Sequence, residues 1–124
     1  MKIEIKLGDY QKSIDAQIDL ATCLEFTLSW GECSDDSVDL LRVCSAGIGV
    51  ALDKESLFPK YRPEKEKITV YGRRVLERLL LKNIPMNDIY SSGTIILKSM
   101  AEALPHKKEV EDKKDFFPSQ EEGI

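Results

Sequence analysis

The chain of 124 residues contains a single histidine, His106, which stands beside Pro105 in a charged stretch near the C-terminus. Catalysis needs a group that exchanges protons or attacks, held next to a partner that orients it. Nothing in this polar stretch would orient the imidazole or shield it from water. The shortage of histidine therefore argues against Ser-His-Asp and Cys-His centres, and we expect no catalytic residues and no enzyme activity.

Cysteine is also scarce, and its count is odd: Cys23, Cys33 and Cys44. The lack of any C-x-x-C pair argues against a disulfide framework and a zinc site, so we expect reduced thiols. The densest acidic group consists of three residues: Asp35, Asp36 and Asp39. A hard cation needs six or more oxygen ligands, and no calcium-loop spacing follows these aspartates. We therefore expect neither a metal nor another cofactor.

No apolar run approaches the roughly 18 residues of a membrane span. The best candidate, residues 43–52, is interrupted by Ser45, Gly47 and Gly49. In residues 1–10 charges are interleaved with isoleucines, which argues against a signal peptide. We therefore expect a cytoplasmic protein without a membrane partner. The two glycines also lack the third glycine and the preceding strand of a dinucleotide-binding fingerprint.

The net charge of −4 conceals an uneven distribution. Residues 1–59 hold five basic and eleven acidic side chains, whereas residues 60–82 hold eight basic and three acidic ones. Opposed charge blocks favour intramolecular pairing or head-to-tail association, and salt should weaken either. We expect self-association, or docking on an acidic partner, to use a basic face formed by four residues: Arg73, Arg74, Arg78 and Lys82.

The N-terminal residues predict a β-hairpin. Residues 2–7 alternate strictly between apolar and charged side chains, as in a strand with one buried face. Gly8 and Asp9 supply a turn, and residues 10–14 can return as the second strand.

Residues 15–30 fit two patterns. Leu20, Ala21, Leu24 and Leu28 form a helical stripe, while the residues from Leu24 to Trp30 also alternate as in a strand. We favour the helix because the stretch is long and rich in good helix formers. Gly31 would end that helix.

From Ser34 onward the spacing of apolar residues is helical. Ser34 and the two aspartates after it predict a helix start. The buried stripe of this helix would consist of Val38, Leu41, Cys44, Ile48 and Leu52. Gly47 and Gly49 would allow another backbone to approach closely, because glycine is otherwise unfavourable in a helix. Residues 53–67, with two prolines and mixed charge, predict a long loop.

Two further helices are expected between residues 69 and 104. The first covers residues 69–82, with Arg73, Arg74 and Arg78 outward, and its inward residues are Val75, Leu76, Leu79 and Leu80. Pro85 would be the first helical residue of the second, since its fixed φ suits that position. The inward residues of this last helix would be Met86, Ile89, Ile96, Leu97, Met100 and Leu104.

These patterns predict a mainly α fold, with three to five helices after a short N-terminal hairpin. Residues 1–104 form one domain, with the hairpin at 1–14, and residues 105–124 form an extended or mobile charged tail. That tail carries an isolated aromatic pair before a proline: Phe116, Phe117 and Pro118. Two such rings either fold back on the body or insert into another protein, where aromatic anchors supply much binding energy.

The outline of a helix-turn-helix offers an alternative function. Residues 75–97 predict two helices joined at Asn83, Ile84 and Pro85. Residues 86–97, which would read DNA, contain one aspartate and no lysine or arginine. Phosphate contacts dominate DNA affinity, so this helix is poorly suited to recognition, and nucleic acid is not the expected partner.

Six features succeed one another between residues 38 and 118: Leu41-Arg42-Val43-Cys44-Ser45-Ala46, the loop Pro59-Lys60-Tyr61-Arg62, Tyr71-Gly72-Arg73-Arg74-Val75-Leu76, Pro85-Met86-x-x-Ile89, Gly93, and Leu104-Pro105 before a charged tail with two phenylalanines. In this order they resemble small helical proteins of tailed-bacteriophage structural modules. The plan is most similar to that of tail assembly chaperones.

The resemblance implies a non-enzymatic helper that binds the tape-measure protein, another tail protein or copies of itself, or else a small component of the virion. It assigns no functional residue. The residues themselves indicate Phe116, Phe117 and Pro118, together with Arg73, Arg74 and Arg78, as the partner-binding set. The expected location is the host cytoplasm, or the virion itself.

Overall fold

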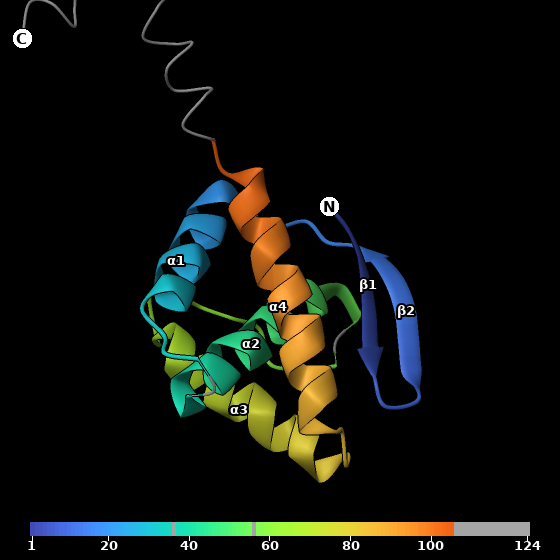
Figure 1. Ribbon diagram of the computed structural model, residues 1–124. Coiled ribbons are helices and arrows are strands. Elements are labelled where there is room, and N and C mark those ends of the chain that lie inside the picture. Colours follow the sequence, from blue (N-terminus) through green and yellow to red (C-terminus); the bar gives the residue numbers. More distant parts are fainter. Residues whose placement is uncertain (36, 56, 106–124) are drawn as a thin grey trace, which may run out of the picture.

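The computed structural model describes residues 1–35, 37–55 and 57–105. Within these ranges the chain forms an N-terminal antiparallel hairpin followed by four α-helices, as predicted (Figure 1). The elements are β1 (Lys2–Leu7), β2 (Tyr10–Asp15), α1 (Leu20–Gly31), α2 (Val38–Ala51), the short 3₁₀ helix η1 (Asp53–Glu55), α3 (Ile68–Leu81) and α4 (Met86–Ala103).

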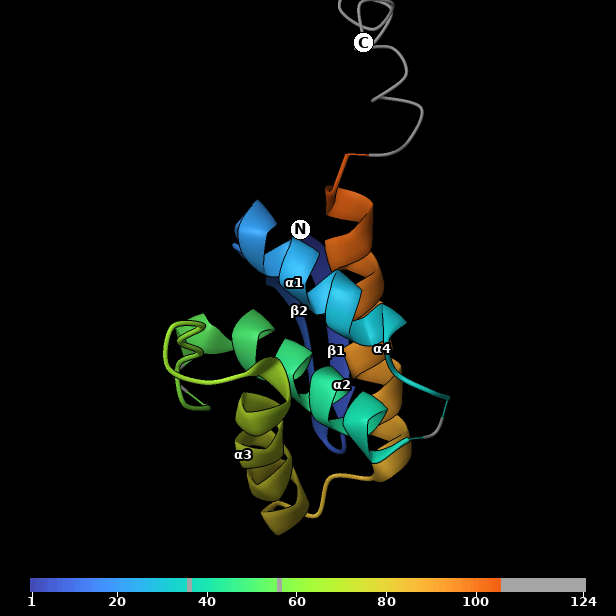
Figure 2. The same ribbon diagram turned by 90° about the vertical axis from the view of Figure 1, so that its left-hand side faces the viewer.

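Helix α2 lies at the centre of the helical body. Both ribbon views place it between α1 and α3 (Figures 1 and 2), and α3 and α4 make their most extensive helix contacts with it. Its side chains are buried almost throughout residues 41–51. A helix that is apolar on all sides belongs inside a protein, so the composition of α2 dictates its central position.

The neighbouring helices approach α2 closely at two glycines of their own. A Cβ atom at Gly72 of α3 would fall on the carbonyl oxygen of Arg42. A Cβ atom at Gly93 of α4 would collide with the Cβ of Cys44. Only the lack of a side chain lets these backbones pack directly against α2.

The prediction that another backbone approaches Gly47 and Gly49 of α2 is therefore wrong. Gly47 faces the side chain of Ile96, and Gly49 faces the side chains of Tyr71 and Val75. These two glycines leave room for large side chains of α4 and α3. The helix spacing is set instead by glycines on the partner helices.

The hairpin packs its apolar face against α4. Ile3, Ile5 and Leu7 are buried, and Gly8 turns the chain with a positive φ of 64°. Two α4 side chains bind the hairpin backbone. The Ser92 hydroxyl accepts from the Lys6 amide (3.2 Å) and donates to the Lys6 carbonyl (2.8 Å), while the Asp88 carboxylate accepts from the Gly8 amide at 2.8 Å. These contacts fix the hairpin to the helical body.

Two predicted helix starts are corrected. The hydroxyl of Ser37, not that of Ser34, accepts from the Leu40 amide at 3.0 Å and caps α2. Val38 follows this cap and is exposed, although it was expected in the buried stripe. Pro85 is the N-cap of α4 and not its first helical residue. In both cases more than one neighbouring residue suits the start of the helix, and the packing of the helix decides where it begins.

The loop between η1 and α3 packs its aromatic side chains against the helices: Phe58 is buried and Tyr61 is half-buried. The Tyr71 hydroxyl donates to the Pro59 carbonyl at 2.6 Å. Tyr61 lies between two other rings, with centroid distances of 5.6 Å to Phe26 and 5.0 Å to Tyr71. The loop therefore links α1 to α3.

Alkaline pH should destabilise this fold. Burial raises the pKa of Tyr61 to about 12 and that of the Cys44 thiol to about 11, and it also raises the pKa of Tyr71. These groups keep their protons to higher pH in the folded chain than in the unfolded chain. Their contribution to the free energy of unfolding is therefore complete below the pKa values of the unfolded chain, and it is lost as pH rises through the pKa values of the folded chain. We expect the urea concentration at the unfolding midpoint to decrease as pH rises from about 9 to about 12. Tyr61→Phe should flatten that fall; an unchanged pH dependence would contradict the assignment.

Candidate protein-binding surface

Helix α1 is apolar on two opposite faces. Its inner face buries Cys23 and Phe26 completely. Its outer face displays Leu20, Leu24 and Leu28, which are 56%, 48% and 58% exposed. Glu25 is the one charged residue among the twelve of this helix. A helix that is apolar all round is normally buried, so its outer face has the character of a contact surface.

This arrangement corrects the expected stripe of α1. The helix assignment is confirmed, but Leu20, Ala21, Leu24 and Leu28 point outward. Two apolar stripes share this helix, and spacing alone cannot tell which one faces the core. The aromatic side chain of Phe26 faces the interior, where it packs edge-on against the ring of Tyr61.

The segment of the sequence that contains α1 is acidic. From Ser13 to Leu41 the chain has no lysine or arginine, and this segment holds seven carboxylates: Asp15, Asp19, Glu25, Glu32, Asp35, Asp36 and Asp39. A partner that covers the leucines must therefore present apolar side chains together with positive charge. We call Leu20, Ala21, Leu24, Glu25 and Leu28 the α1 surface.

A hollow adjoins the α1 surface at Leu28. Its volume is about 650 Å³, and it opens between α1 and the start of α3. Leu28, Tyr61 and Ile68 supply apolar walls, and charged side chains such as Glu25 and Lys67 surround them. The leucine stripe thus ends in a recess that a partner's side chains could fill.

The outer face of α3 is basic on balance, with Glu77 as the one carboxylate of the helix. Arg73, Arg74 and Arg78 are exposed, as predicted. Arg74 holds Glu66 through two contacts of 2.7 and 2.8 Å, and Arg73 holds Glu77 at 3.3 Å. Arg78 forms no ion pair with any described residue.

Apolar side chains interleave with these arginines. Val70 and Leu80 are about half exposed, and Leu81 is 82% exposed. Leu80 and Met86 were expected to face inward; both are exposed, because Leu80 follows the buried Leu79 onto the outer side of α3 and Met86 is the first residue of α4. We call Val70, Arg73, Arg74, Arg78, Leu80 and Leu81 the α3 surface.

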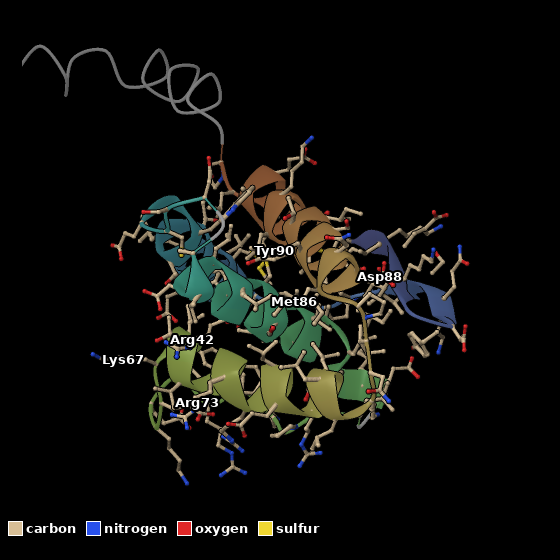
Figure 3. The ribbon with its side chains drawn as sticks, turned by 60° about the horizontal axis from the view of Figure 1, so that its bottom comes forward. Arg42, Lys67, Arg73, Met86, Asp88 and Tyr90 are labelled. Carbon is tan, nitrogen blue, oxygen red and sulfur yellow. The ribbon has the colours of Figure 1, made fainter. Side chains whose placement is uncertain are left out.

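Further cations lie beside the start of α3. Figure 3 shows Arg42 of α2 and Lys67, the N-cap of α3, near Arg73. Arg42 is held by Asp39 at 3.3 Å. The basic region thus extends from the α3 surface onto the adjoining end of α2.

The aromatic pair, the single histidine and one aspartate cannot be located in the fold. Phe116, Phe117, Pro118, His106 and Asp36 lie outside the described residues. Among the described residues, no group of three or more His, Cys, Asp or Glu side chains is placed to hold a metal ion. In that same part of the chain, no helix is long and apolar enough to cross a membrane.

The segment predicted as a helix-turn-helix consists of α3, residues 82–85 and α4. Both helices pack on α2 from different sides (Figure 2), and α4 also packs on α1 and β1. The arginines lie on α3, whereas the exposed face of α4 carries Lys98 as its one basic residue. The positive charge is therefore on the helix that precedes the turn, not on the one that would enter a DNA groove.

No family model, curated protein or solved structure matches this chain.

Proposed function

We propose that this chain is a non-enzymatic protein-interaction protein of bacteriophage tail assembly, acting as a tail assembly chaperone or as a small virion component. The outer face of α1 carries the protein-interaction part of the proposal. Three leucines one turn apart face solvent on a helix whose opposite face is already buried. Water contact with such a face is unfavourable by about 25 cal/mol per Å², so a protein partner that covers it gains free energy.

The assignment to phage tails is supported by the resemblance of residues 38–118 to small proteins of tail modules. In this proposal the partner is a tape-measure or other tail protein, met in the host cytoplasm during assembly. Phe116 and Phe117, with Pro118 to stiffen the chain after them, are proposed to anchor that tail protein. Burial of both rings would contribute roughly 3–6 kcal/mol.

Co-expression with a tape-measure protein encoded beside this chain tests the proposal. We expect the tape-measure protein to be more soluble and to co-purify with the chain. Replacement of Phe116 and Phe117 by alanine should weaken the complex by about 100-fold or more, because a loss of about 3 kcal/mol corresponds to that factor. The body should unfold at an unchanged denaturant concentration.

Three results would contradict parts of this proposal. Equal solubility of the tape-measure protein without the chain would reject the chaperone role. Full binding by the double alanine variant would reject the aromatic anchor. Salt-sensitive binding of duplex DNA that is lost when Arg73, Arg74 and Arg78 become glutamine would favour the DNA-binding alternative instead.

A further inference from the structure

We propose that the α1 surface of one copy binds the α3 surface of a second copy, so that copies join head to tail. This inference rests on the proposed function, because it names one partner of the same apolar face. It follows from the chemistry of the two surfaces, which match in hydrophobic character and oppose in charge.

The α1 surface is unsuited to pairing with itself. Two α1 helices side by side would bring together Glu25 and Glu32 of both copies, because the lysines nearest to them, Lys65 and Lys67, lie across the hollow and not on α1. Like charges brought together across an interface are unfavourable. A symmetric dimer through α1 is therefore disfavoured by its own electrostatics.

The α3 surface provides what the α1 surface lacks. Val70, Leu80 and Leu81 can cover the leucines of α1, and Leu81 is the most exposed large hydrophobic side chain among the described residues. Arg78 has no ion-pair partner within the described part of its own chain and can meet a carboxylate such as Glu25 of the second copy. The α3 surface is thus complementary in both charge and hydrophobicity.

The positions of the two surfaces allow this geometry. Helix α1 and the start of α3 line the same hollow, while the leucines of α1 and Leu80 and Leu81 at the far end of α3 are exposed, so each copy presents both surfaces at once (Figures 1 and 2). An interface between two different surfaces is heterologous, and it continues until the copies close a ring or extend as a filament. The wild-type chain should therefore form species larger than a dimer as concentration rises.

Two complementary variants test the pairing. Leu24→Lys places a positive charge in the α1 surface, and Leu81→Glu places a negative charge in the α3 surface. Each variant alone should be monomeric by sedimentation equilibrium at concentrations where the wild type associates. An equimolar mixture should associate, because the intact α1 surface of the Leu81→Glu variant meets the intact α3 surface of the Leu24→Lys variant.

Controls separate folding from association. Ile95→Lys changes a similarly exposed residue of α4 outside both surfaces, and it should associate like the wild type. The urea midpoint of each variant shows whether it is folded; if Leu24→Lys or Leu81→Glu unfolds, Glu25→Lys and Arg78→Glu replace them in the same mixing experiment. An increase of salt from about 0.1 M to about 1 M, which shortens the screening length from about 10 Å to about 3 Å, should weaken association about tenfold.

Three outcomes would overturn the inference: a wild-type chain that stays monomeric, a Leu81→Glu variant that associates like the wild type, or a mixture of the two variants that stays monomeric. None of these outcomes depends on the tail protein. A monomeric chain that still solubilises the tape-measure protein would refute the head-to-tail interface and leave the proposed function standing. A chain that forms oligomers but does not bind the tape-measure protein would support the head-to-tail interface and refute the proposed function.

Discussion

Replacement of Gly72 by alanine is expected to destabilise the protein by about 3 kcal/mol or more, a large part of the roughly 5–15 kcal/mol available to a small domain. The new Cβ would fall on the carbonyl oxygen of Arg42. That oxygen belongs to the backbone of α2, so it cannot rotate away as a side chain would. The contact can be relieved only if α3 moves away from α2 and loosens the core between them.

Urea unfolding followed by circular dichroism measures this effect, and Gly31→Ala is a matched control. Gly31 ends α1, and a Cβ there would meet no atom within 4 Å. The same substitution should leave stability unchanged or raise it by about 0.5–1 kcal/mol, since alanine restricts the unfolded chain. Equal midpoints for the two variants would show that α2 and α3 do not pack as described.

Replacement of Phe26 by alanine should cost about 3–5 kcal/mol, the usual range for a buried aromatic ring. Phe26 is fully buried and packs edge-on against Tyr61. With Cys23 it forms the inner face of α1, so its loss should also loosen the helix that carries the α1 surface.

Leu24→Ala is the matched control for Phe26→Ala, because Leu24 lies two residues away on the outer face of α1. We expect Leu24→Ala to change the free energy of unfolding by about 0.5 kcal/mol or less. If Leu24→Ala were the more destabilising of the two variants in urea unfolding, the orientation of α1 would be reversed and the α1 surface would not exist.

The sequence predicted those parts of the fold whose pattern has one interpretation. Residues 2–7 alternate strictly, and β1 buries Ile3, Ile5 and Leu7 as expected. The stripe of α3 through Val75 and Leu79 was also predicted, because arginines occupy the opposite face. In both elements the charged residues lie on the face opposite the buried stripe, although Val70, Leu80 and Leu81 also lie on the outer face of α3.

Helix α1 shows where this reasoning stops. Both of its faces are apolar, and the leucines have a more regular helical spacing than Cys23 and Phe26. The choice between the faces depends on which side chains fit against Tyr61 and α4, and that is a tertiary property. A useful signal was nevertheless present in the sequence. Only one residue of this twelve-residue helix is charged, so a helix α1 at the protein surface would expose apolar side chains.

The glycines show a second limit. Four glycines lie within the three helices that pack together, and each is unfavourable there by about 1 kcal/mol, so each needs a reason. The sequence drew attention to Gly47 and Gly49 because they are close together. In the structure, Gly72 and Gly93 are the glycines that contact the backbone of α2. Only the packing of α3 and α4 on α2 distinguishes these two glycines from Gly47 and Gly49.

Photo-crosslinking from position 24 tests most directly whether the α1 surface binds protein. A photoreactive amino acid replaces Leu24 in the full chain, which is co-expressed with its proposed tail partner; a second version carries the same group at the exposed Asp9 of the hairpin turn. Mass spectrometry then identifies the joined residues. Adducts from position 24 to another protein molecule, either α3 of a second copy or the tail protein, with few from position 9, are the predicted result. Adducts from position 24 that stay within its own chain, or that match those from position 9, would contradict a binding role for α1.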